Sequence, residues 1–573
     1  MSPGVRSRFP GKVHFRRLLK ESADSVHSFR EESRRSSERI LKQVKGRPAF
    51  AAEIKYKLER EQSDGILHFL DNFLELDEVK SSGVNRKNVD KYLGFVGLLM
   101  VLNLSSTSSP LRIVANPAQR SKSGYKNNDN VSPGEAYIEK IRSMFLRMRL
   151  NPIVSLGDIS NFYLRVKIDT LGTLSGAVWL QRDKQGRAVL NPDLDAPLEI
   201  AVFVASRFGQ VDAGTLAALA RNYAVDAYIN HYPANEDKLP TSLVEEVRPV
   251  ITRAYVDDVL HSVSAKSMEL NNEPLSRTGY VGQFGSEQFE MLAMTLTRTL
   301  EFTGFSIKKF VLPPDQELQT RLNTNPLLSC NQPDPVSEER PPAKDVHREG
   351  VRREHRDSGP ASDQVSPRPA EHLLGVAWHS DDSLGLRRKM LNVGKAKGGI
   401  RPKETELKDP EAFDKFVNKH GSLTRRQLIS LISQTFNPLG DLAGIFHLAS
   451  RVLARDVMLE TDHVLQWEER VNPKWNARTR ELVKLFYCLQ VFSIKRYAIL
   501  GVFPRDMKIY LYCLTDGSPQ AAVALTYVVS VPKQQDPTTP EGQANHVSLL
   551  RCALSTSTLG GRTTAANECK AGE

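Results

Sequence analysis

The chain has 573 residues, of which 40% are hydrophobic and 25% charged, as in a soluble globular protein of about three or four domains. Lysine and arginine number 78 against 67 aspartates and glutamates, and this net charge of +11 favours polyanionic partners. The five cysteines form no CxxC pair, and the longest apolar run is residues 93–102. These features argue against a zinc knuckle, a disulfide framework and a membrane-spanning helix, and they predict an intracellular protein.

Residues 1–60 carry 16 Lys and Arg against 7 Asp and Glu, a local excess of nine positive charges. The segment is rich in serine and poor in aromatic residues, which predicts a basic, partly disordered arm. Such an arm either adds affinity for nucleic acid or is only a solvated tail.

In residues 61–150, apolar positions at helical spacing predict one helix that starts near Gly65. Residues 96–104 predict a strand that leads into a segment containing Arg112. A loop containing Lys122, Gly124 and two asparagines follows, and a second helix is expected over residues 135–150.

An apolar strand over residues 153–157 ends in Asp158, and the aromatic pair Phe162 and Tyr163 follows. Residues 177–180 predict another strand, with residues 183–186 as the turn that ends it.

Residues 207–212 predict a turn before a helix that includes residues 215–220, with Asp212 or Thr215 available as its N-cap.

Residues 254–260 hold two adjacent aspartates, Asp257 and Asp258, among β-branched and aromatic residues. Apolar residues on both sides, from Ile251 to Val263, predict two short strands with Asp-Asp as the turn. Burying two carboxylates is costly unless a cation neutralises them, and Mg²⁺ accepts oxygen ligands and bridges to phosphates. The alternative is an exposed acidic hairpin tip.

The sequence Tyr-Val-Asp-Asp that ends at Asp258, with Asp158 upstream, resembles the polymerase motifs of reverse transcriptases. The resemblance implies that Asp158, Asp257 and Asp258 hold two Mg²⁺ ions (Mn²⁺ being the alternative) for nucleotidyl transfer, with Ile159 beside them as a further metal ligand. It also implies that Tyr163 stacks under the incoming sugar and excludes a 2′-hydroxyl. The alternative for Tyr163 is an ordinary core tyrosine.

The order of Arg112, the basic loop and Asp158 is similar to the passage from fingers to palm in Bel/Pao-type retrotransposon reverse transcriptases. This resemblance implies that Arg112 touches the triphosphate, whose oxygens a planar guanidinium binds bidentately. It also places Phe208 and Gly209 in the nucleotide pocket.

The second polymerase-like motif departs from the family pattern. Members of the family usually have Pro before Phe-Gly and Ser-Pro at the helix start, where this chain has Arg207 and Ala213-Gly214. These departures leave the nucleotide pocket in doubt.

Residues 289–302 predict a helix, and the segment that follows, residues 304–310, resembles the Gly-Phe-x-x-x-Lys-aromatic segment of the family. The resemblance implies that Lys309 lies near the pyrophosphate leaving group; the alternative is a solvated lysine at a strand end.

Residues 312–370 are dominated by proline and charge, which predicts a disordered insertion. The insertion contains an Asp-Ser-Gly triplet at residues 357–359. Because charged residues and proline surround it, we reject an aspartic protease.

Residues 373–379 resemble the Leu-Gly-x-x-Trp strand of the family, which grips the primer. Thr424 has capping-box spacing to Gln427, and residues 435–440 are predicted to end the helix that follows. This block resembles the Pao "peptidase" region, but it shows no nucleophile and base, so we interpret it as a helical thumb or connection.

Residues 509–518 and 521–529 predict a strand, a turn and a strand that resemble the opening of a retroelement RNase H domain. The resemblance makes Asp516 the first metal ligand of an RNase H remnant, with Glu568 as a weak second. Without a later carboxylate, RNase H activity is not expected.

These observations predict an α+β protein: a right-hand polymerase with fingers, a palm with an antiparallel sheet and a helical thumb, followed by a truncated RNase H-like α/β start. The expected boundaries are 1–60 arm, 61–150 fingers, 151–311 palm, 312–370 insertion, 371–505 palm end with thumb or connection, and 506–573 RNase H-like start.

The expected function is that of an RNA-directed DNA polymerase. Its expected partners are an RNA template, a DNA primer or hybrid duplex, dNTP and other segments of a retroelement polyprotein, with no membrane. The alternative is a decayed or repurposed copy that binds nucleic acid without polymerising. The expected location is the cytoplasm, in a particle, with nuclear entry left open.

Overall fold

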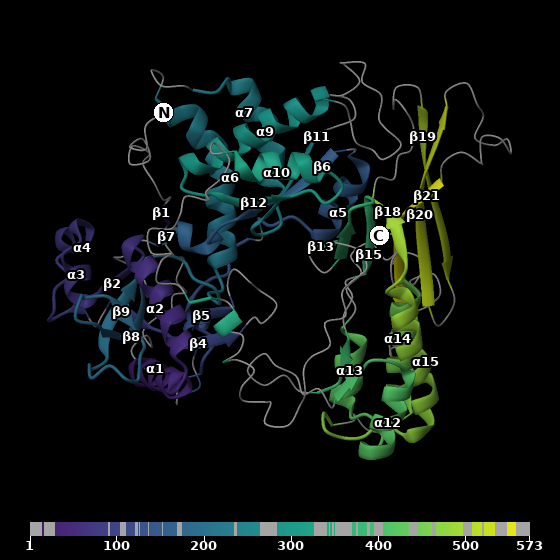
Figure 1. Ribbon diagram of the computed structural model, residues 1–573, viewed down its shortest axis with the longest axis horizontal. Helices are drawn as coiled ribbons and strands as arrows, with labels where there is room; N and C mark the ends of the chain where they lie inside the picture. The colour runs from purple at the N-terminus through teal and green to yellow at the C-terminus, as the bar shows by residue number, and fades with distance from the viewer. Residues whose placement is uncertain are drawn as a thin grey trace.

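The structure is a computed structural model, shown in Figure 1. It describes residues 14–15, 29–89, 92–102, 110–120, 124, 126–135, 137–151, 153–168, 175–233, 238–263, 283–325, 341–342, 344–346, 349, 370–373, 376–386, 390–394, 405–434, 444–460, 466–496, 507–517, 521–532 and 547–556.

A three-stranded antiparallel sheet lies at the centre of the largest core. Its middle strand, β6 (Ile153–Ile159), pairs with β11 (Asp258–Val263) on one side and with β12 (Ile307–Val311) on the other. Every residue of β6 except Asp158 is buried, because the run is apolar and both faces of the strand are covered. A β-carbon on Gly157 would lie 3.2 Å from Ile307 Cγ2, so the small residue lets β12 approach closely.

Helices pack on and around this sheet (Figure 1). Their apolar faces share one core with the strands. The predicted helices at residues 215–220 and 289–302 are confirmed as parts of longer ones. The helices are α5 (Ile141–Leu150), α6 (Ala213–His231), α7 (Thr241–Thr252), α9 (Gln283–Phe302) and α10 (Gln316–Thr324).

A second core lies under another sheet, of order β2-β10-β8-β3, and a neighbouring hairpin of β4 and β5. The predicted strand at 177–180 lies in β8, and the predicted turn is confirmed because Gly186 N–H donates to Asp183 O at 3.0 Å. The elements are β2 (Leu67–Phe69), β3 (Leu93–Phe95), β4 (Gly97–Leu102), β5 (Leu111–Asn116), β8 (Ser175–Arg182), β9 (Ala188–Val189) and β10 (Glu199–Phe203).

The prediction of a partly disordered arm is wrong for its second half. The helices α1 (Arg30–Val44) and α2 (Pro48–Ser63) pack on the second core. The serines that suggested disorder form the buried face of α1: Ser33 Oγ donates to Val96 O at 2.7 Å, and Ser36 Oγ accepts from Leu98 N–H at 2.6 Å. A strand of two residues, β1 (His14–Phe15), precedes them and pairs with β7 (Lys167–Ile168).

Two helix predictions for residues 61–150 need correction. The single helix expected from Gly65 is instead the strand β2 followed by α3 (Leu70–Leu74) and α4 (Asp77–Ser81), because pairing with β10 outweighs local helical spacing. The helix expected over 135–150 begins only at Ile141; just before it, Glu139 N–H donates to Ala254 O at 3.4 Å instead of making a helical bond.

The predicted insertion at 312–370 is partly structured. Its first part contains α10, whose buried Leu318 and Leu322 join the main core. Glu349 accepts hydrogen bonds from Ala49 N–H and Phe50 N–H, both at 2.9 Å, and so caps the start of α2. The Asp-Ser-Gly triplet lies outside the described residues.

The C-terminal half contains a sheet of order β13-β14-β15-β18 and a group of helices. The single strand predicted at 373–379 is instead parts of two strands, β13 (Ala370–Leu373) and β14 (Val376–His379), which pair antiparallel. The capping box at Thr424 is confirmed, and the helix that it starts ends at Ile432, whereas residues 435–440 lie outside the described part. The other elements are β15 (Ser383–Leu386), β16 (Leu391–Asn392), β17 (Glu406–Leu407), β18 (Ser493–Lys495), α12 (Pro410–His420), α13 (Arg425–Ile432), α14 (Gly444–Leu459) and α15 (Asn476–Leu489).

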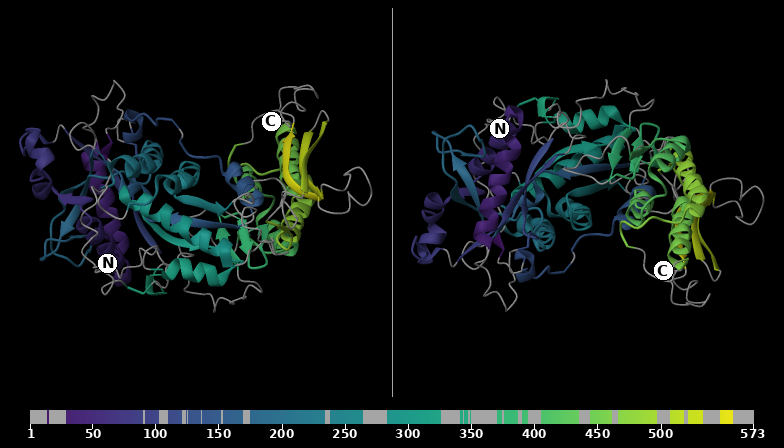
Figure 2. Two further views of the ribbon diagram at one scale, coloured as in Figure 1. Left: turned by 90° about the horizontal axis from the view of Figure 1, so that it is seen from above. Right: turned by 90° about the horizontal axis from the view of Figure 1, so that it is seen from below.

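The last described elements form a separate antiparallel sheet of β19 (Met507–Gly517), β20 (Ala521–Pro532) and β21 (Val547–Thr556). The two predicted strands are confirmed, with Asp516 opposite Val523, whereas residues 518–520 between them and Glu568 lie outside the described residues. Figure 2 shows this sheet (yellow) at the opposite end of the molecule from the purple N-terminal helices. Among the described helices, none is long and apolar enough to span a membrane.

A buried ion pair joins the C-terminal half to the main core, and it yields a stability prediction. Arg496 is fully buried; it donates to both Asp382 carboxylate oxygens, at 2.6 and 2.9 Å, and to Met148 O and Asn151 O of the α5 end. We expect Arg496→Met to cost about 3–5 kcal/mol, because it leaves a buried carboxylate unpaired. Thermal unfolding should show a lower midpoint, whereas Arg35→Met, which removes an exposed pair with Glu31, should change it little.

Candidate active site

The register of the central sheet brings two of the predicted catalytic aspartates together. Asp158 near the end of β6 lies directly opposite Asp258 at the start of β11. Directly opposite residues of antiparallel strands share one face of the sheet, with β-carbons about 4.5–5.5 Å apart. The third aspartate, Asp257, precedes β11, and its carbonyl accepts from Ile159 N–H at 2.9 Å. The three predicted residues therefore meet at one edge of the sheet.

The hairpin that carries Asp257 is tighter than predicted. Tyr255 and Asp258 form a bridge with reciprocal hydrogen bonds of 3.0 and 2.9 Å, so Val256 and Asp257 make a two-residue loop, not Asp257 and Asp258. The expected first strand is absent: Ile251 is buried in α7. Val256 has φ +53°, a left-handed conformation that costs a β-branched residue about 1–2 kcal/mol.

Burial raises the pKa of all three aspartates, and neighbouring carboxylates raise the pKa of Asp257 and Asp258 further. Burial, followed by the charges of Asp257 and Asp158, raises the pKa of Asp258 to about 7. Burial also raises the pKa of Asp257, with a contribution from Asp158. Burial raises the pKa of Asp158 as well, although the positive charges of Lys308, Lys309 and Arg112 oppose the shift. A cation bound here would favour the charged carboxylates and so lower these pKa values.

The donors fit Mg²⁺ chemically but do not form a complete cage. Among the described residues, no group of three His, Cys, Asp or Glu side chains is arranged closely enough to enclose a metal ion. Mg²⁺ usually binds through one or two carboxylates and keeps waters or substrate phosphates as its other ligands. Three partly desolvated carboxylates beside an open pocket meet that requirement.

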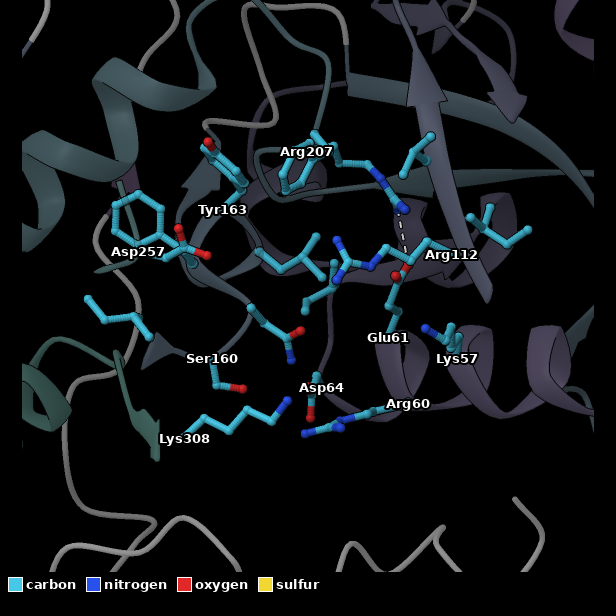
Figure 3. Close-up of a pocket in the computed structure, with 18 of the residues that line it drawn as sticks. Lys57, Arg60, Glu61, Asp64, Arg112, Ser160, Tyr163, Arg207, Asp257 and Lys308 are labelled. Atoms are coloured by element: carbon cyan, nitrogen blue, oxygen red, sulfur yellow. Dashed lines mark hydrogen bonds and ion pairs between the residues drawn. The ribbon is translucent and has the colours of Figure 1, made fainter. Parts of the chain in front are cut away.

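A cavity of about 380 Å³ adjoins Asp158 and Asp257 (Figure 3). It lies between the two cores, with the aspartates and aromatic residues on one side and α2 with β5 on the other. Its lining contains the predicted site residues Arg112, Asp158, Ile159, Tyr163, Phe208 and Asp257.

Several cations of the pocket were not predicted. Lys57 and Arg60 project from α2, which we had assigned to the arm and its boundary with the fingers. Lys308, not Lys309, lines the pocket, because the pairing of β12 with β6 shifts register between Ile307 and Lys309. Such a bulge redirects a side chain. In Figure 3 the charged ends of Arg60 and Lys308 lie together, beside Asp64.

Tyr163 forms part of the pocket wall. It follows β6 in the short 3₁₀ helix Phe162–Arg165, and its ring meets that of Phe208 edge to face at 4.7 Å between centroids. Burial raises the pKa of Tyr163. Phe208 is 57% exposed, so the pair presents an aromatic surface to the pocket.

The turn of the second motif is held by backbone contacts. Gly209 has φ +93°, and a β-carbon there would lie 2.9 Å from Ala115 O of β5. Asn128, from the loop after β5, donates to Gly209 O at 2.9 Å and accepts from Val211 N–H at 3.1 Å. Neither predicted cap forms: Asp212 makes no side-chain cap bond, and Thr215 Oγ1 donates to Pro133 O and Glu135 O.

Arg207, the departure from the family pattern, makes an ion pair in the pocket wall. Its Nη1 lies 3.0 Å from Glu61 Oε2 of α2 (Figure 3). Its guanidinium also packs on the Phe203 ring at 3.4 Å from the centroid. Arg207 is only 3% exposed. The residue therefore ties the turn that bears Phe208 to the helix that bears Lys57 and Arg60.

The fold and site thus define a mixed helix-and-sheet protein with clustered carboxylates beside a cationic pocket. Residues 424–540 match the family described as "Pao retrotransposon-like RNaseH-like domain". This match confirms the resemblance to Bel/Pao-type retroelement polyproteins. It spans α13 to β20 and so crosses the boundary that we predicted between residues 505 and 506.

Two solved structures match the chain at low similarity. One is the foamy viral protease–reverse transcriptase in complex with an RNA/DNA hybrid, with TM-score 0.36, 12% identity, and coverage of 88% of this chain and 46% of that chain. The other is the foamy viral protease–reverse transcriptase dRH in complex with double-stranded DNA, with TM-score 0.36, 11% identity, and coverage of 89% and 56%. This chain spans about half the length of each. No curated protein matches the sequence.

The raised pKa of Asp258 predicts a pH-dependent stability in the absence of metal. A carboxyl group whose pKa is about 7 in the folded protein and near 4 in the unfolded chain destabilises the fold as pH rises through that interval. In EDTA at pH 8 we therefore expect Asp258→Asn to be more stable than wild type by about 2–4 kcal/mol. At pH 3.5 the side chain of Asp258 is largely neutral in both the folded and the unfolded protein, and the advantage should nearly vanish. Thermal unfolding measures both; equal midpoints at pH 8 would contradict the prediction, and Asp193→Asn in an exposed loop is the control.

Proposed function

We propose that the chain is an RNA-directed DNA polymerase that transfers nucleotides from dNTP to a primer 3′-hydroxyl by two-metal chemistry. The observation that carries the proposal is the register that sets Asp158 opposite Asp258, with Asp257 at the hairpin tip beside the cationic pocket. The match to a Pao retrotransposon family supports the biological context.

Each side of the pocket has a distinct task in this proposal. The three aspartates hold the metal ions, with the Ile159 backbone beside them. Bound Mg²⁺ would supply activation of the attacking hydroxyl and stabilisation of the leaving oxygen. Arg112, Lys57, Arg60 and Lys308 bind the triphosphate, which a cluster of guanidinium and ammonium groups neutralises.

The aromatic side of the pocket selects the sugar. Tyr163 stacks under the incoming deoxyribose, held from behind by the edge of Phe208. Lys309 lies outside the pocket lining, so we transfer its proposed role near the pyrophosphate to Lys308. The proposed partners are an RNA template, a DNA primer and, in the polyprotein, other segments of the retroelement.

The second candidate is a copy that binds nucleic acid without polymerising. Arg207 favours it, because the buried pair with Glu61 occupies a wall of the pocket where the family usually has proline. Primer extension on a homopolymer template separates the two. Template binding without extension would favour this second candidate.

Asp257→Asn should reduce primer extension by about 10³-fold or more, because the metals contribute several kcal/mol of transition-state stabilisation. Affinity for template-primer, which comes mainly from Lys and Arg on phosphates, should stay within about twofold. Steady-state extension and fluorescence anisotropy measure the two quantities. Asp226→Asn on α6, which removes an exposed charge far from the pocket lining, should leave both unchanged.

Tyr163→Ala should keep extension with deoxynucleotides but increase relative incorporation of ribonucleotides by about tenfold or more, since a lost steric contact changes discrimination by about 1–3 kcal/mol. Tyr163→Phe retains the ring and should discriminate like wild type. Unchanged discrimination in an active Tyr163→Ala enzyme would identify Tyr163 as a core residue only. Tyr223→Ala, which removes an exposed tyrosine of α6, is the control.

A further inference from the structure

All backbone carbonyls of the aspartate hairpin, from Arg253 to Asp258, have a hydrogen-bond donor. The Tyr255 and Asp258 carbonyls each accept a hydrogen bond from the backbone N–H of the other residue. The Asp257 carbonyl accepts one from Ile159 N–H. The remaining three carbonyls are bound from outside the sheet. Their donors are Arg147 Nη2 for Arg253 O at 2.6 Å, Glu139 N–H for Ala254 O at 3.4 Å, and Arg221 Nη1 for Val256 O at 2.7 Å.

The Val256 carbonyl is the critical one, because it lies at the strained position. Val256 is the only β-branched residue among the described non-glycine residues with positive φ. A conformation of this kind persists only where the surroundings over-determine it. The next residue is Asp257, so a change in the Val256 peptide reorients the carboxylate that faces the pocket.

Arg221 of α6 is held in position for the hydrogen bond to Val256 O. Its side chain is fully buried, and its other nitrogens, Nε and Nη2, donate to Asn222 Oδ1 at 3.3 and 3.1 Å. Burial lowers the pKa of Arg221 to about 10, whereas Glu139 favours its charge, so the guanidinium stays charged at neutral pH. A buried guanidinium is costly unless its donors are used, and the shortest bond it makes is the one to the hairpin tip.

We propose that Arg221 is a positioning residue that holds the Val256 peptide and thereby sets the Asp257 and Asp258 carboxylates for metal binding. This inference rests on the proposed polymerase function and extends it to a residue that touches neither substrate nor metal. Asn222 orients the guanidinium from the same helix.

The test measures metal affinity first, independently of catalysis. In the full chain, Mn²⁺ is titrated by electron paramagnetic resonance without nucleotide into wild type, Arg221→Met and Arg221→Lys. We expect Arg221→Met to weaken Mn²⁺ binding about tenfold or more, and Arg221→Lys, which keeps the charge and one donor, to lie between it and wild type. In extension assays kcat should fall about 10–100-fold in Arg221→Met, with KM for dNTP and template-primer affinity within about threefold of wild type.

Arg496→Met is the matched control, because it removes another fully buried arginine, one that donates to Asp382, Met148 O and Asn151 O. It should lower the unfolding midpoint and leave the Mn²⁺ affinity of the folded protein unchanged. If Arg221→Met does not fold, Arg221→Lys becomes the deciding variant.

A folded Arg221→Met with wild-type Mn²⁺ affinity overturns the inference, as does an Arg221→Lys indistinguishable from wild type where Met does not fold. If wild type binds Mn²⁺ but extends no primer, the proposed function fails while the titrations still decide the role of Arg221. If wild type binds no Mn²⁺, both fail.

Discussion

The hairpin from Arg253 to Asp258 must hold Asp257 and Asp258 beside Asp158 of β6, so that three carboxylates lie together at one end of the sheet. Nothing in the side chains themselves favours this arrangement, since burial raises the pKa of all three and like charges raise the pKa of Asp257 and Asp258 further. The backbone supplies the constraint. On one side the β6–β11 register fixes Asp158 against Asp258; on the other, α5 and α6 bind the carbonyls that the two-residue loop leaves outside the sheet.

The pocket depends on a second constraint, because its two walls belong to different cores. Lys57, Arg60 and Arg112 lie on α2 and β5, which pack on one core, whereas Asp158 and Lys308 lie on β6 and β12, which pack on the other. Asn128 joins Gly209 to the segment after β5, and Arg207 joins the same turn to Glu61. The turn of the second motif, residues 207–212, thus sets the distance between the cations and the carboxylates of the pocket.

The structure could be predicted from the sequence where neighbouring residues along the chain determine it. The strand ending in Asp158, the turn at Gly186 and the capping box at Thr424 each follow from apolar runs or turn residues within a few positions. The structure could not be predicted where residues far apart in the sequence determine it by packing or pairing. The buried serine face of α1 needs β4 to be recognised as a packing surface, and the strand β2 exists because β10 pairs with it. Lys308 lines the pocket in place of Lys309 because the register between β12 and β6 shifts once. The residue types at these positions do not predict this shift.

Arg207 has a role in the structure that its residue type does not indicate in the sequence. In the sequence it appears as a loss, since proline preorganises a turn and arginine does not. In the structure the guanidinium stacks on Phe203 and pairs with Glu61, and the turn is further fixed by Asn128, so hydrogen bonds replace the rigidity that a ring would give. With arginine at this site, Phe208 is therefore positioned by a contact with α2 and not by a stiff local backbone. Any movement of α2 on binding a triphosphate would then pass directly to the aromatic wall that we propose meets the sugar.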